Sequence, residues 1–320
     1  FYFFRPFDAF RIGRQIIHRS GIGLVSVQDP AESGIAGWLL KKTHGIKLHI
    51  QIHADFFSPF FRKNSWKELM RYWLARFIIP QGDKFRVVSQ RVADSLNSEF
   101  SIQHSAISLL PIFVDCERIA ATKPSFDLRQ KYPESDFIII MVSRLVREKN
   151  IPLALSAFRD FLKEFPNSGL VIVGDGPERK NLQLTTHDLQ LTENVRFEGW
   201  QKDLVSYYKT ADLYLLTSNF EGYGRTVVEA VAAGLPVVMT DVGVAGKIII
   251  EGKSGRVVSV GSASELLAAL LRTRRNHNSA RQMAETAKAM VLKLPPKEWP
   301  EYLQMYSKSF IVKDEVSKSK

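Results

Sequence analysis

The chain has 320 residues, of which 45% are hydrophobic and 24% are charged, a composition typical of a globular protein with room for two domains. Its net charge of +11 favours acidic partners such as nucleic acid, an anionic membrane or a phosphorylated ligand. The single cysteine, Cys116, excludes an internal disulfide, and the longest apolar runs fall far short of the roughly 18 residues that span a bilayer.

The chain begins with Phe1, and its first residues lack the charged start, long apolar core and small-residue cleavage site of a signal peptide. We therefore expect the sequence to be cut from a longer protein, with the first domain incomplete at its start. Because only one cysteine is present, a reducing, cytoplasmic location is expected.

Short apolar runs rich in β-branched residues alternate with amphipathic segments along nearly the whole chain. We expect strands at 23–27, 47–53, 85–89, 106–111, 137–143, 169–174, 194–199, 213–218, 236–240 and 255–260. Helical patterns between them include 151–165 and 263–275. Apolar strands that alternate with helices predict parallel sheets covered on both faces. The predicted fold class is α/β, with two Rossmann-like, doubly wound domains that face a cleft.

The stretch from Pro111 to Asp136 is more polar and contains three prolines. We place the domain boundary in it, with an N-terminal domain over residues 1–125 and a second domain over residues 126–297. The last helix, at about 298–320, is expected to pack back on the first domain.

Residues 61–79, "FRKNSWKELMRYWLARFII", combine five cations with five aromatic residues, and we expect one amphipathic helix there. Such a helix can lie on an anionic membrane, with its aromatic residues in the interface. Alternatively, Leu69, Trp73 and Phe77 pack on the sheet and the cations point into water. The sequence leaves both interpretations open.

Two glutamates flank a Gly-x-Gly turn in "SNFEGYGRTVVEAVAAGLPVV". Glu221 follows an expected strand, and a helix is expected to begin near Arg225 or Thr226, so Glu229 lies in its early turns. The free amides at a helix start attract anions. On spacing alone, the two glutamates could equally be surface residues of a capped helix.

Other loops after expected strands also carry charge or glycine. Arg144 and Lys149 in "MVSRLVREKN" suit a diphosphate, although the same spacing fits a solvated basic loop. "VIVGDGPERKNL" matches half of a dinucleotide-binding motif, but its third glycine position is Arg179, which favours a tight turn into a helix. "GVAGKI" is too short for a phosphate-binding P-loop and lacks Ser or Thr after Lys247.

Five of these segments stand in an order that matches a known family. "SRLVREKN", "GDGPERKNL", "VRFEGW", "TSNFEGYGRTVVEAVAAGLPVV" and "SGRVVSV" together resemble the donor-binding domain of the family 4 glycosyltransferases, which have the GT-B fold and a Glu-x7-Glu hallmark. The resemblance is close over residues 137 to about 270. It is looser over residues 20–120, through "VQDP", "QIHADFF", "VVSQRVADSL" and "LLPIFVD".

The resemblance implies a role for each charged position. Arg144 and Lys149 would hold the donor diphosphate, and Glu229 would accept hydrogen bonds from the ribose hydroxyls. Glu221 would contact the transferred sugar. His53, at the end of a strand of the first domain, would face that sugar across the cleft.

The remaining donor contacts implied by the resemblance involve mainly the backbone. The amides of the glycine-rich turn would help to hold sugar and phosphate, and the "EGW" segment would lie near the nucleobase. The positions expected to contact the donor in this way are Gly199, Trp200, Gly222, Tyr223, Gly224, Arg225 and Thr226.

The reaction implied is metal-independent transfer of a sugar with retention of anomeric configuration. The donor would be a UDP-sugar or GDP-sugar and the acceptor a glycan or lipid-linked glycan, in cell-surface polysaccharide or glycolipid synthesis at the inner membrane face. The sequence shows no Asp-x-Asp motif and no cluster with metal-ligand spacing. Nucleic acid is not an expected partner, because the basic cluster at 272–275 fits a charged helix end.

Two departures and three alternatives accompany this hypothesis. The glycine-rich loop that opens the first domain in the family is missing, and Lys247 stands where a glutamate is expected. The alternatives are a nucleotide-sugar-binding protein without turnover, a retaining hydrolase with two carboxylates at one bond, and a basic scaffold. Both glutamates lie in one loop and helix and one is assigned to ribose, which disfavours hydrolysis; the intact charged set favours a transferase.

Overall fold

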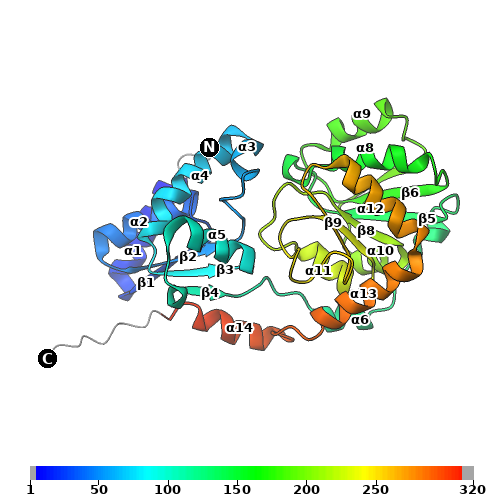
Figure 1. Ribbon diagram of the computed structural model, residues 1–320. Coiled ribbons are helices and arrows are strands. Elements are labelled where there is room, and N and C mark those ends of the chain that lie inside the picture. Colours follow the sequence, from blue (N-terminus) through cyan, green and yellow to red (C-terminus); the bar gives the residue numbers. More distant parts are fainter. Residues whose placement is uncertain (1–4, 312–320) are drawn as a thin grey trace. The chain divides into compact units, whose positions relative to one another are not determined.

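The computed structural model describes residues 5–311, which form two compact units. In Figure 1 the first unit has colours from both ends of the colour bar, and the second has colours from its middle. One unit combines the chain up to Ile112 with the chain from Trp299 onward, and the other comprises Phe113–Glu298. Residues 113–125, expected in the first domain, belong to the second unit. They do so because the helix α6 (Cys116–Ala121) packs against α11 (Arg225–Ala232).

The first unit contains a four-stranded parallel sheet whose strands lie in chain order. The strands are β1 (Leu24–Val27), β2 (Lys47–Ile52), β3 (Lys84–Val87) and β4 (Ile107–Leu109). The helices are α1 (Arg5–Ser20), α2 (Glu32–His44), α3 (Phe61–Asn64), α4 (Trp66–Ile78), α5 (Gln90–Phe100) and α14 (Trp299–Lys308), with 3₁₀ turns at Ile79–Gln81 and His104–Ala106. Because the strand order does not reverse, this sheet has no topological switch point over the described strands.

Helix α14 reaches buried polar groups of this sheet through two tyrosines. The Arg86 guanidinium donates to the Tyr302 hydroxyl at 2.7 Å, and the Gln51 amide donates to the Tyr306 hydroxyl at 2.7 Å. Burial lowers the pKa of Arg86, so these partners stabilise a cation held away from water. Helix α14 therefore completes the polar interior of the first unit.

The expectation of one helix over residues 61–79 is wrong. Helix α3 ends at Asn64, and Ser65 is extended, with φ −160°. The Ser65 hydroxyl accepts from the Lys67 amide and donates to the Glu68 carboxylate, so a Ser-x-x-Glu sequence with capping-box spacing starts α4. The serine therefore divides the segment into a short helix and a long one.

The interpretation that packs Leu69, Trp73 and Phe77 on the sheet is also wrong. Trp73 is 61% exposed and Phe77 is 51% exposed, and Leu69 is exposed as well. The face of α4 that packs on the unit consists of Tyr72, Ala75 and Ile78.

The second unit contains a six-stranded parallel sheet in the order β10-β9-β8-β5-β6-β7. Its strands are β5 (Phe137–Val142), β6 (Ser168–Val173), β7 (Val195–Gly199), β8 (Leu213–Leu216), β9 (Val237–Thr240) and β10 (Arg256–Val258). Its other helices are α7 (Leu128–Lys131), α8 (Ile151–Leu162), α9 (Arg179–Asp188), α10 (Leu204–Thr210), α12 (Ala263–Arg275) and α13 (His277–Val291), with a 3₁₀ turn at Arg147–Lys149.

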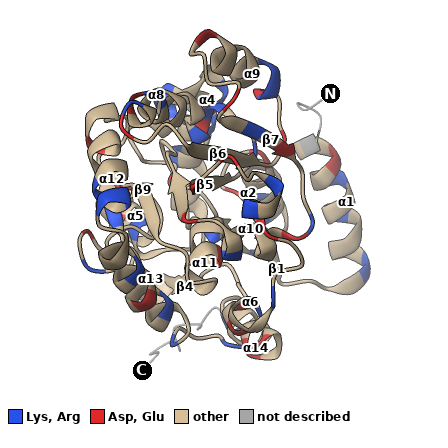
Figure 2. Ribbon diagram, turned by 90° about the vertical axis from the view of Figure 1, so that its right-hand side faces the viewer, with Lys and Arg blue, Asp and Glu red and all other residues tan. Residues whose placement is uncertain are grey.

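The order of this sheet reverses between β5 and β8, so these neighbours form a topological switch point, where such sheets bind ligands at the carboxyl ends of the strands. The central strands are fully buried and uncharged, and Figure 2 shows the charged residues mainly on the helices and loops around them. All ten predicted strands are confirmed, with ends within two residues of those expected. The predicted α/β class with two parallel-sheet units is confirmed as well.

The basic cluster at the end of α12 pairs with acids of the same unit. Arg274 lies 3.6 Å from Asp136 and also over the Phe137 ring, and Arg275 pairs with Glu164. These contacts agree with the interpretation of the cluster as a charged helix end.

Candidate active site

The loops that leave β5 and β8 lie side by side because these strands are neighbours in the sheet. The Thr217 hydroxyl donates to the carbonyls of Lys149 and Asn150, and the Asn150 amide donates to the Asn219 side chain at 3.0 Å. Asn150 has φ 45°, which turns the chain from the 3₁₀ turn into α8. The topological switch point is therefore built from two loops that hydrogen bonds join.

Glu221 and Lys149, predicted from separate motifs, form an ion pair across these loops. Lys149 Nζ lies 2.5 Å from Glu221 Oε1, and their side chains are only 15% and 14% exposed. The Ser218 hydroxyl donates to the same carboxylate oxygen at 2.9 Å. A partly buried carboxylate is costly without such partners, so one cation and one hydroxyl hold Glu221 in place.

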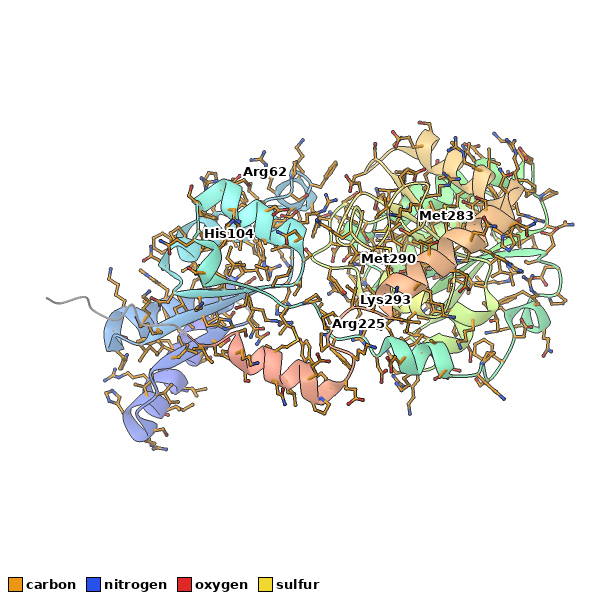
Figure 3. All side chains as sticks on the ribbon, turned by 60° about the horizontal axis from the view of Figure 1, so that its bottom comes forward. Arg62, His104, Arg225, Met283, Met290 and Lys293 are labelled. Atoms are coloured by element: carbon orange, nitrogen blue, oxygen red, sulfur yellow. The ribbon has the colours of Figure 1, made fainter. Side chains whose placement is uncertain are left out.

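Glu229 lies one turn into α11, and both of its oxygens have partners. Oε1 accepts from Arg225 Nε at 2.8 Å, and Oε2 accepts from the Tyr208 hydroxyl at 3.0 Å. Burial and the Glu229 charge raise the pKa of Tyr208 well above its ordinary value, so the phenol remains a donor. Arg225 begins α11 and is labelled in Figure 3. The glutamate is thus held at the helix start by two donors.

Arg144 is placed differently from Lys149. Its guanidinium lies 3.2 Å from Glu148, four residues further along the chain, and its side chain is 76% exposed. It therefore remains free to move toward a ligand at the same edge of the sheet.

The glycine-rich turn requires glycine for conformation and for space. Gly224 has φ 90° and precedes α11. Gly243, in the loop after β9, has φ 55°, and a Cβ there would meet the Tyr223 carbonyl oxygen at 2.4 Å. The loop after β9 therefore lies directly against the turn that carries Glu221. Sequence reasoning did not identify Gly243 as part of this arrangement.

Several predicted donor contacts are already engaged within the unit. Tyr223 is buried, which raises its pKa to about 12, so a ligand can meet only its backbone. The Thr226 hydroxyl accepts from the buried Tyr214 hydroxyl at 2.6 Å. Gly222 is buried within the turn. These residues shape the turn.

The "EGW" segment lies at the end of β7, which β5 and β6 separate from β8 in the sheet. Gly199 has φ 70°, and its carbonyl accepts from the Gly174 amide at 2.7 Å. Glu198 is held by Lys131, Tyr132 and Tyr207. Trp200 is 74% exposed, so its indole is free to contact a ligand.

The glycines of "GDGPERKNL" form a tight contact, as the sequence favoured. A Cβ on Gly174 would meet the Ser143 carbonyl oxygen at 1.9 Å, and one on Gly176 would meet the Leu145 carbonyl oxygen at 2.4 Å. The segment therefore packs on the loop after β5.

Lys247 lies in an exposed turn after β9, where its amide donates to the Val244 carbonyl at 3.2 Å. Nothing in the structure explains a lysine at this position.

His53 belongs to the first unit and follows β2. Its Nε2 atom is buried and has no hydrogen-bond partner within the described chain. Burial and the nearby Arg86 lower the pKa of His53, so the imidazole is neutral at physiological pH. A buried, unpartnered ring nitrogen at the carboxyl end of a strand is suited to a ligand contact.

Residues 5–311 contain neither a metal-binding cluster nor a membrane-spanning helix. No three side chains of His, Cys, Asp or Glu among residues 5–311 come together in a way that could hold a metal ion. No helix in that range combines the length and the apolar character needed to cross a bilayer.

Two family models match the chain. The model described as glycosyl transferases group 1 matches residues 124–290, and the model described as glycosyltransferase family 4 matches residues 2–118. The first match covers more than half of the chain.

Curated relatives include an alpha-monoglucosyldiacylglycerol synthase from Acholeplasma laidlawii, 31% identical over 56% of this chain. An N-acetyl-alpha-D-glucosaminyl L-malate synthase from Bacillus anthracis is 26% identical over 87% of it. A UDP-Gal:alpha-D-GlcNAc-diphosphoundecaprenol alpha-1,3-galactosyltransferase from Escherichia coli is 25% identical over 76%. The chain spans 45%, 72% and 64%, respectively, of the lengths of these three relatives.

Solved structures share the fold at low sequence identity. Anabaena HepE in complex with UDP-glucose superposes with a TM-score of 0.76 at 20% identity, covering 94% of this chain and 80% of that one. The sucrose-phosphate synthase from Thermosynechococcus elongatus superposes with a TM-score of 0.78 at 22% identity, covering 93% and 76%. The matched family models and this GT-B fold show that the chain belongs to the family 4 glycosyltransferases.

Proposed function

We propose that the protein is a retaining glycosyltransferase that moves a sugar from a nucleotide-sugar to a glycan or lipid-linked acceptor in cell-surface polysaccharide or glycolipid synthesis. The observation that carries the proposal is the pair of anchored carboxylates at the switch point. Glu221 is held by Lys149 and Ser218, and Glu229 is held by Arg225 and Tyr208. The Glu221 carboxylate suits a hydroxyl of the transferred sugar, and the Glu229 carboxylate suits the ribose hydroxyls.

In this proposal, the bond between the sugar and the diphosphate breaks, and the diphosphate leaves with the bonding electron pair. Lys149 and Arg144 stabilise the charge that develops on it, helped by the amides at the start of α11. The acceptor hydroxyl attacks the anomeric carbon from the same face and gives its proton to a phosphate oxygen of the departing diphosphate. His53 faces the donor sugar. Because two cations already meet the diphosphate charge, the chemistry requires neither a metal ion nor another cofactor.

The donor is expected to be a UDP-sugar or GDP-sugar. Two similar proteins support this expectation: HepE was solved in complex with UDP-glucose, and the name of the E. coli galactosyltransferase includes UDP-Gal. Within this site, the exposed Trp200 would lie near the nucleobase, and the backbone of Gly199, Gly222, Tyr223 and Gly224 would approach the donor. Arg225 and Thr226 would support that backbone at the start of α11.

A lipid-linked acceptor and a cytoplasmic location at the inner membrane face belong to the same proposal. Two relatives carry the names of lipids, diacylglycerol and diphosphoundecaprenol. An enzyme that uses a soluble nucleotide-sugar and a lipid acceptor would work at the surface of a membrane.

The alternatives differ in what they require of the two glutamates. Hydrolysis needs one carboxyl group that gives a proton to the leaving group, but Glu221 and Glu229 each accept from a cation and a hydroxyl. A binding protein without turnover would use the same contacts but transfer nothing.

The test is a titration calorimetry series with UDP, GDP and ADP, followed by assays of their sugar conjugates with and without a chelator. We expect one nucleotide to bind and Lys149→Ala to abolish that binding. We also expect turnover that a chelator leaves unchanged and a product with the anomeric configuration of the donor. Nucleotide binding without transfer to any glycan or lipid-linked acceptor would favour the binding protein, and binding of no nucleotide by the folded chain would refute both.

A further inference from the structure

Helix α4 has two apolar faces, and only one of them packs on its own unit. The exposed face, here named the α4 stripe, consists of Trp66, Leu69, Met70, Trp73 and Phe77. At about 100° of rotation per residue, these five side chains fall within an arc of about 100°. The buried residues Tyr72, Ala75 and Ile78 occupy the opposite side.

Exposed apolar residues scattered singly are normal on a protein surface, but the stripe is continuous. Its members are three or four positions apart, the spacing at which side chains on a helix are neighbours. Trp66 is 62% exposed, and Phe77 touches its own unit through the edge of the Trp38 ring, at 5.1 Å between centroids. A contiguous exposed apolar surface of this kind marks an interaction site.

The cations around the stripe differ in how they are held. Arg71 pairs with Glu32 at 3.1 Å, and Arg76 pairs with Glu99 at 2.6 Å. Arg62, labelled in Figure 3, lies over the Tyr72 ring, 5.7 Å from its centroid. These three cations are therefore committed to contacts within the unit.

Two lysines beside the stripe are not held in this way. Lys63 and Lys67 are exposed, and neither has an ion-pair partner within the described chain. Residues 1–112 contain 15 Lys and Arg but only 8 Asp and Glu, so they carry most of the net positive charge of the protein. A partner for the stripe must combine apolar material with negative charge.

We propose that the α4 stripe inserts into the headgroup region of an anionic lipid surface. The two tryptophans would lie at the level of the headgroups, the aliphatic residues and Phe77 would reach the acyl boundary, and Lys63 and Lys67 would meet lipid phosphates. A second copy of the chain is a poorer occupant, because pairing two stripes would bring their lysines together. This inference deepens the proposed function, on which it rests for the lipid-linked acceptor.

The contacts around the stripe indicate which residues the experiment should replace. Arg71 and Arg76 are poor targets, because their loss would leave Glu32 and Glu99 without partners. Trp66→Ser with Trp73→Ser removes two exposed indoles, and Lys63→Gln with Lys67→Gln removes two exposed charges. Leu184→Ser and Lys253→Gln are matched controls, since both residues are exposed in the second unit.

The measurement is co-sedimentation of the full chain with vesicles of phosphatidylglycerol mixed with phosphatidylcholine, compared with phosphatidylcholine alone. We expect binding only to the mixed vesicles. Each tryptophan substitution should lower the partition coefficient about tenfold. Each lysine substitution should lower it about fivefold, and added salt should remove most of that difference. Both control variants should bind as the unchanged protein does.

Three results would overturn the proposal: no sedimentation of the folded protein, sedimentation that the tryptophan variant retains, or an equal loss in Leu184→Ser. A change of oligomeric state in the tryptophan variant, without a change in vesicle binding, would assign the stripe to a second copy. Neither donor nor acceptor is present in this test, so its result does not depend on nucleotide binding. If the protein binds the vesicles here but binds no nucleotide in the calorimetric titration, the proposed function is refuted and the assignment of the stripe stands. Unchanged circular dichroism shows that each variant is folded.

Discussion

Replacing Glu221 by glutamine is expected to tighten the binding of a nucleoside diphosphate, although it alters the centre of the candidate site. In the protein without ligand, Lys149 is paired with Glu221 at 2.5 Å. A diphosphate must therefore compete with the carboxylate for the lysine. The amide of glutamine still fits the space and can accept from Ser218, but it carries no charge, so the lysine becomes available.

The magnitude follows from the geometry of the pair. With an effective dielectric constant of about 20, two unit charges at this distance attract by about 7 kcal/mol before solvation is counted. Desolvation of the two mostly buried charges and the hydrogen bond that the amide retains cancel most of this attraction, which leaves a net value of about 1 kcal/mol. Releasing Lys149 should therefore tighten UDP or GDP binding about fivefold. Turnover should fall about 10-fold to 100-fold, since a charged hydrogen bond to the sugar is lost.

The assay is calorimetric titration with the nucleoside diphosphate that binds, at low and at high salt. Glu148→Gln is the matched control, because it removes the carboxylate paired with Arg144, whose side chain is 76% exposed. An exposed pair contributes little, so this control should change affinity less than about twofold. Weaker binding in Glu221→Gln, or an equal gain in the control, would refute the idea that the ion pair competes with the ligand.

Three further predictions follow from individual contacts. Tyr208→Phe leaves one oxygen of Glu229 without its buried donor, which should weaken nucleotide binding about tenfold. Inorganic pyrophosphate has no ribose and should bind as before. Equal losses of affinity for both ligands would contradict the ribose role of Glu229. Gly243→Ala should lower the free energy of unfolding in urea by about 3 kcal/mol, because φ is 55° and a backbone oxygen lies 2.4 Å from the new Cβ. Gly246→Ala, with φ 78° but open space, should cost only about 1 kcal/mol. Burial and nearby carboxylates raise the pKa of Cys116 to about 11, so its rate of reaction with a thiol reagent should rise about tenfold per pH unit up to that value; a plateau near pH 8.5 would contradict this burial.

The strands and several helix ends could be predicted from sequence because local signals agree there. The run at 137–142 is apolar throughout and lies in the middle of the second sheet. The helix at 263–275 was predicted to both ends, since the Ser262 hydroxyl caps it by accepting from the Glu265 amide. The helix after Gly224 begins at Arg225, as expected.

The segment 61–79 was mispredicted for a reason that the sequence contains. Ser65 and Glu68 have the spacing of a capping box, but the continuous amphipathic pattern around them favoured a single helix. The pattern also could not show which apolar face packs inward, because α4 has two. Only the structure distinguishes the face of Tyr72 and Ile78 from the face of Trp73.

Within the candidate site, the sequence identified the carboxylates but not what holds them. Tyr208 is distant along the chain from Glu229, and no short motif joins the two, so this buried hydrogen bond could not be predicted. Ser218 stands three residues before Glu221 in the same motif, so the hydrogen bond from its hydroxyl to the carboxylate could have been predicted. Arg225 was expected to touch the donor, yet its side chain holds Glu229.

The ion pair between Lys149 and Glu221 affects the order in which the diphosphate and the sugar of the donor are bound. Lys149 is expected to bind the diphosphate, and its present partner, Glu221, is expected to bind the sugar. A diphosphate that draws the lysine away would therefore leave Glu221 with only the Ser218 hydroxyl, and so with free capacity to accept from a sugar hydroxyl. Binding of one part of the donor would thereby prepare the contact for the other. A nucleoside monophosphate reaches the lysine less well, so it should leave the pair closed and compete poorly with the complete donor.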